Sequence, residues 1–210
     1  MDYIFFDFNG TIVDDVDICL DLLNVMLEKC GHEIVSKERY LEIFTFPVKK
    51  YYVLAGFDFE KDNWEELANF FIDEYKKGNK NCLLFSDIKE TLDKLKKQNK
   101  HLYILSASEK TMLLNQLEFY GIKDYFDEIL GKDNIYADGK EKMGIDFMKK
   151  MNLPREKCVF VGDTLHDGET GDAMGIKSYL ISRGHQSKEV LLSSGKRVFD
   201  TLKEIDFDEE

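Results

Sequence analysis

Three polar segments of the sequence carry side chains that could act together on a phosphate ester. They are Asp7-Phe8-Asn9-Gly10-Thr11, Ser106, and Gly162-Asp163-Thr164-Leu165-His166-Asp167. Carboxylates from the first and third segments could share a Mg²⁺ ion, because this cation prefers a few carboxylates together with water and phosphate oxygens. With the metal neutralising the phosphate, a carboxylate could attack phosphorus and form an aspartyl-phosphate that water later hydrolyses.

A phosphate cradle is the second requirement of this chemistry. A hydroxyl donor and a lysine charge on the non-bridging oxygens would supply it, and we predict Ser106 and Lys140 for these roles. Lys142 competes with Lys140, since both lie in a charged turn before a helical pattern. The charge of this lysine would add to that of the metal in a chain that is otherwise strongly acidic.

Several of these residues also have a purely structural explanation. Asp7 with Asn9 and Gly10 could simply end a strand in a turn. The segment Ser106-Ala107-Ser108-Glu109 is typical of a helix capping box, and Asp167 could cap a helix that begins near Gly168. The acidic third segment makes the turn explanation insufficient for Asp7, because the two segments together form one metal-binding pattern.

The elements that must position these segments are short apolar strands. Helical patterns separate the later strands, so the alternation predicts an α/β fold with a parallel sheet covered by helices. Ligands of such sheets bind at the carboxyl ends of the strands, where the three polar segments fall. The predicted strands are Tyr3 to Phe6, Leu102 to Leu105, Cys158 to Val161 and Ser178 to Ile181, and helical patterns follow Asp87 and Ser108.

The stretch from Asp14 to Phe85 interrupts this alternation. It contains few strand signals, and apolar residues recur at helical spacing from Cys19 to Cys30, where Gly31 ends the pattern, and from Trp64 to Tyr75. We therefore predict two domains, a core of residues 1–13 and 86–210 and an inserted all-helical cap of residues 14–85.

Two further expectations concern the cap and the end of the chain. Within the cap, Phe46-Pro47-Val48-Lys49-Lys50-Tyr51-Tyr52 mixes basic and aromatic residues, so we predict that Lys49 contacts the substrate. The acidic end from Glu204 to Glu210 is expected to be frayed. His166 and His185 have no partner that the sequence identifies.

Composition restricts the class of protein further. The 210 residues carry a formal net charge of −12, which disfavours nucleic acid and anionic membranes as partners and favours a small substrate. The four cysteines form no C-x-x-C pair and are expected to be buried thiols in a reducing compartment. No basic leader and no apolar run of membrane-spanning length occur, so we expect a cytoplasmic protein, either a monomer or a homodimer.

The three segments, in this order and with a helical insert after the first, resemble the haloacid dehalogenase superfamily of hydrolases, and most closely its phosphoglycolate phosphatase-like branch. The resemblance covers nearly the whole chain and implies a three-layer Rossmann-like core, a helical C1-type cap that closes over a small phosphorylated metabolite, and Mg²⁺ as cofactor. It implies catalytic roles for Asp7, Asn9, Ser106 and Lys140, metal ligation by Asp7, Asn9, Asp163 and Asp167, and substrate contacts from Gly10, Thr11, Ser106, Ala107 and Lys140.

Asn9 is the one departure from the family pattern. Phosphatases of the family usually carry an aspartate here, which protonates the leaving group and then activates water. An amide does neither at neutral pH, whereas the family's metal contact from this position uses the main-chain carbonyl and would survive. Turnover should therefore suffer more than metal binding.

Three functions remain open at this stage. The first is a magnesium-dependent phosphomonoester hydrolase of reduced activity. The second is a phosphate-binding or regulatory protein with little turnover. The third is carbon–halogen or phosphonate cleavage, although dehalogenases of the family typically carry tyrosine at the Asn9 position, and phosphonatases carry alanine together with a cap lysine.

Overall fold

A six-stranded parallel sheet forms the centre of the molecule. The computed structural model describes residues 1–133 and 139–209. The strands lie in the order β5-β4-β1-β6-β7-β8, which places β1 between β4 and β6. Their bounds are β1 (Tyr3–Phe6), β4 (His101–Glu109), β5 (Glu128–Lys132), β6 (Cys158–Gly162), β7 (Lys177–Ile181) and β8 (Arg197–Phe199). The predicted α/β fold with a parallel sheet is therefore confirmed.

Helices cover both faces of this sheet, because side chains alternate along each strand. In β1, Ile4 and Phe6 pack on one face with α5 (Ile88–Lys97) and α6 (Lys110–Phe119). Phe5 packs on the opposite face with α7 (Glu141–Met151) and α8 (Leu165–Met174). Both faces of β1 are fully buried, so its run of apolar residues follows from its central position.

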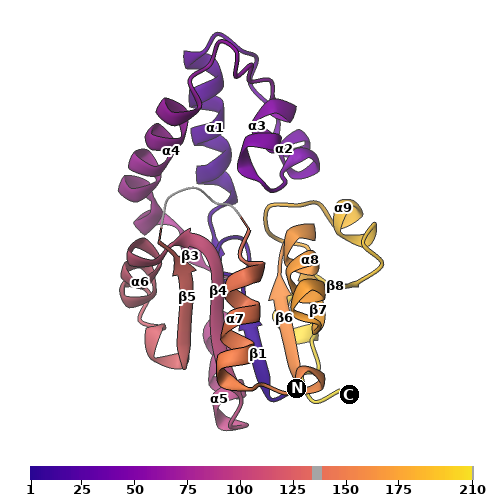
Figure 1. Ribbon diagram of the computed structural model, residues 1–210. Coiled ribbons are helices and arrows are strands. Elements are labelled where there is room, and N and C mark those ends of the chain that lie inside the picture. Colours follow the sequence, from indigo (N-terminus) through magenta and orange to yellow (C-terminus); the bar gives the residue numbers. More distant parts are fainter. Residues whose placement is uncertain (134–138, 210) are drawn as a thin grey trace.

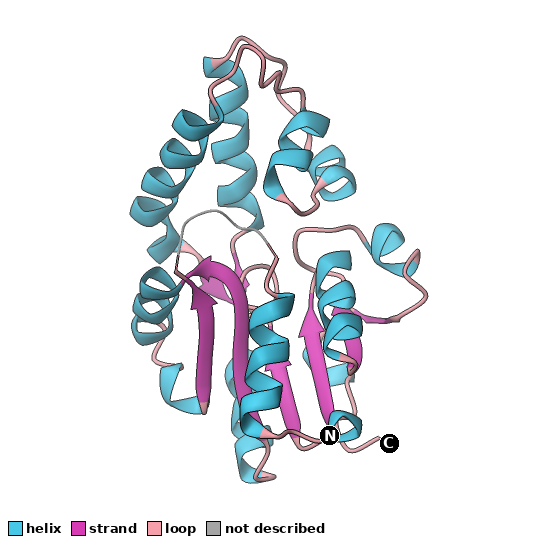
Figure 2. Cartoon of the chain, in the orientation of Figure 1, coloured by secondary structure: helices cyan, strands magenta, loops and turns pink. Residues whose placement is uncertain are grey.

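A helical cap stands over the carboxyl edge of the sheet (Figures 1 and 2). Its aromatic and aliphatic side chains form a hydrophobic core separate from the two around the sheet. The cap helices are α1 (Val16–Lys29), α2 (Lys37–Ile43), α3 (Val48–Ala55) and α4 (Trp64–Gly78), with a 3-10 turn at Asn79–Asn81. A short antiparallel pair, β2 (Val13–Asp14) and β3 (Leu83–Leu84), joins the cap to the core at both connections. The predicted boundary between residues 13 and 14 falls within β2, and that between residues 85 and 86 lies one residue after β3.

The end of the chain does not behave as predicted. Ile205 and Phe207 are buried against the core, and the Phe207 ring lies 6.4 Å from that of Phe6. The ammonium of Met1 also donates to the Phe207 carbonyl at 2.5 Å. The prediction of a frayed tail was wrong because two apolar residues, spaced to face the core, lie among the acidic residues; Glu210 is outside the described residues.

Of the helices in the described part of the chain, none has the length and the apolar character needed to cross a membrane.

Candidate active site

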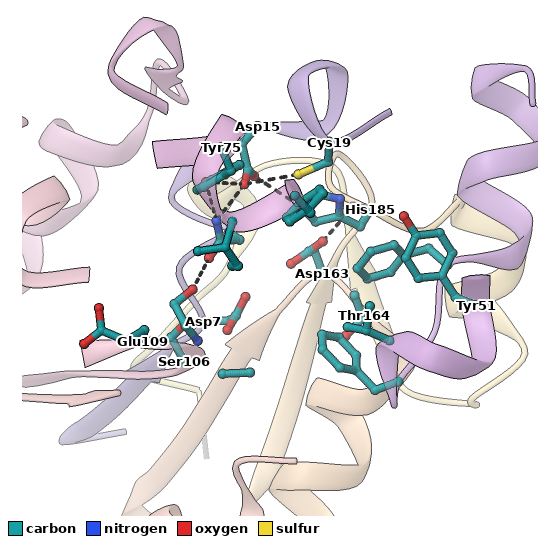
Figure 3. A pocket seen from close by; sticks show the side chains of 18 of the residues that line it. Asp7, Asp15, Cys19, Tyr51, Tyr75, Ser106, Glu109, Asp163, Thr164 and His185 are labelled. Carbon is teal, nitrogen blue, oxygen red and sulfur yellow. Dashed lines mark hydrogen bonds and ion pairs between the residues drawn. The ribbon is translucent and has the colours of Figure 1, made fainter. Parts of the chain in front are cut away.

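The three predicted polar segments meet at the carboxyl edge of the sheet, because β4, β1 and β6 are neighbours. Asp7 directly follows β1, and its amide donates to the Val161 carbonyl at 2.8 Å. Ser106 lies in β4, and Asp163 follows β6. All three line one pocket between core and cap (Figure 3).

Lys140 lies between two of the predicted carboxylates. Its ammonium bonds to Asp7 and lies 2.7 Å from Asp167 Oδ1, and the side chain is 3% exposed. Burial works against the charge on Lys140, but the two carboxylates outweigh it and raise the pKa of the lysine. Lys142, the predicted competitor, is exposed and pairs with Asp146. The structure therefore brings Lys140, and not Lys142, to the site.

Asp7, Asp163 and Asp167 form a group suited to a hard cation. One carboxylate oxygen from each lies within 4.8 Å of the other two, and all three residues are buried. Burial and mutual repulsion raise the pKa of Asp7 to about 8 and that of Asp163 to about 6. A divalent cation would relieve this cost, and an all-oxygen donor set is the one that Mg²⁺ prefers. The residues present thus fit Mg²⁺.

Asp167 also braces the loop that carries Asp163. Its Oδ2 accepts from the amide of Asp163 at 3.0 Å and from the amide and hydroxyl of Thr164 at 2.8 and 2.7 Å. Thr164 is the N-cap of α8, which begins at Leu165, so the helix starts earlier than Gly168. Asp167 sits in the capping box of that helix, and its other oxygen faces Lys140.

Gly10 and Thr11 support the site from behind instead of lining the pocket. Thr11 donates its hydroxyl to Asp163 Oδ1 at 2.9 Å. Gly10 has a φ of +69°, and a Cβ there would lie 2.2 Å from Asp163 Oδ2. Glycine is therefore required both by the backbone conformation and by the close approach of Asp163. We predicted that both residues contact the substrate, but neither of them lines the pocket.

The end of β4, residues 106–109, differs from the predicted capping box. The N-cap of α6 is Glu109, whose carboxylate accepts from the amides of Thr111 and Met112. Ser106 is left outside the cap; its hydroxyl oxygen accepts from the Ser108 amide at 3.1 Å, and Ser106 and Ala107 both line the pocket.

The structure does not bring Lys49 to the pocket. Its ammonium lies 5.0 Å from the ring centroid of Phe59 and 5.9 Å from that of Trp64, and Lys49 is not among the lining residues. These cation–π contacts are with rings outside the segment that made Lys49 a candidate.

Asn9 is held on both sides of its amide. The Nδ2 group donates to Asp15 Oδ2 at 2.6 Å and to the Tyr75 hydroxyl at 2.8 Å, and Oδ1 accepts from the Ser108 hydroxyl at 2.8 Å. Tyr75 donates in turn to Asp15 at 2.8 Å. Sequence reasoning missed Asp15 and Tyr75, and the Asp14-Asp15 pair at the end of β2 was the one available signal.

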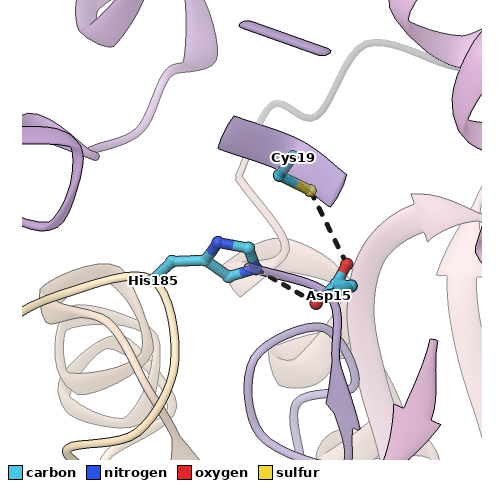
Figure 4. A group of neighbouring side chains, drawn as sticks. All are labelled: Asp15, Cys19 and His185. Carbon is cyan, nitrogen blue, oxygen red and sulfur yellow. Dashed lines mark hydrogen bonds and ion pairs between the residues drawn. The ribbon is translucent and has the colours of Figure 1, made fainter. Parts of the chain in front are cut away.

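His185 was also missed. It follows β7 and is buried, with Nε2 3.3 Å from Asp15 Oδ1 and Nδ1 2.8 Å from the Tyr40 hydroxyl. Burial alone would lower the pKa of His185, but Asp15 outweighs it and raises the value to about 9. Cys19 donates its thiol to Asp15 at 3.8 Å (Figure 4), and burial raises the pKa of that thiol. This hydrogen-bonded cluster links α1 of the cap to the core.

We expect the His185–Asp15 pair to make stability depend on pH. Because the native pKa of His185, about 9, exceeds its usual 6.5, the pair stabilises the fold fully below pH 6.5 and loses this contribution as pH rises through 9. Relative to His185→Gln, wild type should lose roughly 3 kcal/mol of unfolding free energy over this range, measured by urea denaturation in EDTA. An equal pH dependence in both proteins would contradict the assignment.

The chain matches the family model described as haloacid dehalogenase-like hydrolase over residues 4–181. A phosphoglycolate phosphatase of Psychrobacter arcticus is 24% identical over 191 residues, which span 86% of this chain and 83% of that protein. One of Pseudomonas fluorescens is 23% identical over 210 residues, covering 96% and 77%. The fold is shared with a haloacid dehalogenase-like family hydrolase of Streptococcus pneumoniae, with a TM-score of 0.79, 22% identity, and coverage of 94% and 92%.

Proposed function

The chain belongs to the haloacid dehalogenase-like hydrolase family, and on this premise we propose that it is a magnesium-dependent phosphatase of a small phosphorylated metabolite. The observation that carries the proposal is the convergence of Asp7, Asp163, Asp167 and Lys140 at the base of one pocket. The relatives named phosphoglycolate phosphatase support the same class of reaction.

Each of these residues has a distinct task in the proposed reaction. Asp7 attacks phosphorus with a carboxylate oxygen while the bond from phosphorus to the ester oxygen breaks, which gives the aspartyl-phosphate and an alcohol that takes its proton from solvent. Water then attacks phosphorus and releases phosphate and free Asp7. Lys140, already bonded to Asp7 and Asp167, holds the nucleophile in place and offsets negative charge on the phosphoryl oxygens. The Ser106 hydroxyl is available as a donor to those oxygens. Asp7, the Asn9 carbonyl and Asp163, with Asp167 in support, would hold Mg²⁺, which would supply Lewis-acid charge neutralisation when bound.

Asn9 is expected to slow the two proton transfers of the reaction. An amide cannot protonate the leaving alcohol or take a proton from water. Hydrogen bonds to Asp15, Tyr75 and Ser108 fix the orientation of the Asn9 amide. This observation favours a second candidate function, a phosphate-binding or regulatory protein with little turnover.

The experiment that tests the proposal is phosphate release from a panel of phosphomonoesters, measured with Mg²⁺ and with EDTA. We expect slow release that requires Mg²⁺. Absence of release from every ester, together with tight binding of inorganic phosphate, would favour the binding function. Halide or phosphonate turnover without phosphatase activity would instead support the remaining family reactions.

Lys140 and Lys142 offer a matched pair of variants. We expect Lys140→Met to lower kcat/KM by about 10²-fold to 10³-fold, because a preorganised charge on the phosphoryl oxygens is lost. Lys142→Met should leave kcat/KM within about twofold, because that side chain is exposed and pairs with Asp146, away from the pocket. Equal losses in both variants would contradict the placement of Lys140.

A further inference from the structure

The cap side of the pocket is built from aromatic rings. Phe44 and Phe46 come from the segment between α2 and α3, Tyr51 lies on α3, and Trp64 and Phe71 lie on α4. Three of these rings contact one another, with centroids 5.6 Å apart for Phe44 and Phe46 and 5.1 Å for Phe44 and Tyr51. Four of these five rings are only partly buried, Tyr51 being the exception, so the cap presents aromatic surface to a ligand.

Charge on the same surface has one sign. Of the cap residues that line the pocket, Asp15 alone is charged, and on the core side Glu109 adds a second carboxylate beyond the phosphate site. No lysine or arginine of the cap is a lining residue, although the structure describes the whole cap. Asp15 pairs with His185 and Glu109 caps α6, so these carboxylates are already engaged. A second anionic group on a substrate would still need a cation of its own.

Among the described residues that line the pocket, Lys140 and His185 are the cations, and both are already engaged. Lys140 pairs with Asp7 and Asp167. Both ring nitrogens of His185 are used, one by Asp15 and the other by the Tyr40 hydroxyl. The face of the His185 ring stacks on Phe44, at 4.7 Å between centroids with an interplanar angle of 21°. His185 therefore extends the aromatic surface and leaves no nitrogen for a substrate carboxylate.

Resting on the proposed phosphatase function, we infer that the pocket selects phosphate monoesters whose leaving alcohol carries an uncharged aromatic ring. The phosphoryl group lies at Asp7 and Lys140, and the ring stacks among Phe44, Trp64 and Phe71. Phosphoglycolate, the substrate in the names of several relatives, carries a carboxylate where this chain offers rings and Asp15. Burying that carboxylate without a partner is costly, whereas burying a ring is favourable.

Two phosphonates, which have no ester oxygen for a phosphatase to release, test this preference apart from phosphatase turnover. Benzylphosphonate and phosphonoacetate share a methylene phosphonate and differ in carrying a phenyl ring or a carboxylate. With Mg²⁺ present, we expect benzylphosphonate to bind at least about 10-fold more tightly by titration calorimetry. Equal or tighter binding of phosphonoacetate would overturn the inference, whether or not the protein releases phosphate from any ester.

The corresponding esters test the same preference in turnover. Both benzyl phosphate and phosphoglycolate release a primary alcohol, and we expect kcat/KM to be at least about 10-fold higher for benzyl phosphate. A preference for phosphoglycolate would overturn the inference and leave the phosphatase function intact. If neither ester, nor any other of the panel, releases phosphate, the phosphatase function fails and the phosphonate affinities still decide the pocket's preference.

A positive charge placed in the pocket should weaken the selectivity. Phe71→Lys adds a cation on the pocket side of α4, and the benzylphosphonate preference should fall at least about 10-fold. Asn69→Lys adds the same group at an exposed position of α4 that does not line the pocket, and the preference should stay within about twofold. Trp64→Lys is the second variant if circular dichroism shows that Phe71→Lys does not fold. An unchanged preference in a folded pocket variant would contradict the inference.

Discussion

Replacing Asp7 by asparagine is expected to abolish phosphate release, with a loss of about 10⁴-fold or more in kcat, because an amide oxygen is a poor nucleophile toward phosphorus. The fold should survive, since burial raises the pKa of Asp7 to about 8 and a neutral side chain relieves its repulsion with Asp163 and Asp167. Phosphate release measured beside thermal unfolding separates the two effects.

Asp17→Asn is the matched control for this change. Asp17 is an exposed carboxylate on α1 that pairs with Lys37 at 2.6 Å, outside the pocket. We expect it to leave kcat unchanged within about twofold. Release by Asp7→Asn above a tenth of the wild-type rate would exclude Asp7 as the nucleophile.

Returning a carboxylate to position 9 should increase turnover, but only together with a second change. In Asn9→Asp alone, the new carboxylate would lie against Asp15 Oδ2, which is 2.6 Å from the present amide nitrogen, and the two charges would repel. The double variant Asn9→Asp with Asp15→Asn exchanges donor and acceptor and keeps this contact. We expect its kcat to exceed that of wild type by about 10²-fold or more, the usual contribution of general acid catalysis.

Both single variants serve as controls for the exchange. Asp15→Asn alone should give no gain, because it supplies no acid at position 9, and Asn9→Asp alone should gain less than the double variant. If the double variant binds inorganic phosphate as tightly as wild type and still shows no gain, the missing proton donor is not what limits turnover. That outcome would favour the phosphate-binding function.

The core of the fold was predictable because one physical pattern repeats along it. Strands β1, β4, β6 and β7 are apolar runs, and the polar segments that follow three of them had to meet once those strands were parallel neighbours. Strand β5 was missed because Glu128-Ile129-Leu130-Gly131-Lys132 is short and flanked by charge, and β8 because it has only three residues. Edge strands need less apolar sequence, since neighbouring elements bury fewer of their side chains.

The parts of the site that escaped prediction depend on contacts over long sequence separations. Asp15 meets His185 across 170 residues, and Tyr40 meets it across 145. No periodicity in the sequence reports such contacts, because they arise where the cap rests on the core. Lys49 was chosen from the composition of its segment, but cation–π contact with Phe59 occupies its charge.

The same reasoning explains why the substrate preference could not be inferred from the sequence. The aromatic residues of the cap are also residues of its hydrophobic core, and their spacing fits either role. Only the arrangement in space distinguishes Leu67, which is buried in the cap, from Phe71 on the same helix, which lines the pocket.

Detection of a phosphoryl group on Asp7 during turnover tests the central claim most directly. Because Asn9 cannot activate the water that breaks down the intermediate, the aspartyl-phosphate should accumulate when protein, Mg²⁺ and benzyl phosphate are mixed and quenched in acid. Mass spectrometry of the digested protein is predicted to find phosphate on the peptide that contains Asp7, and none in Asp7→Asn. Steady phosphate release with Asp7 unmodified at every quench time, or with the phosphoryl group on another residue, would contradict the account.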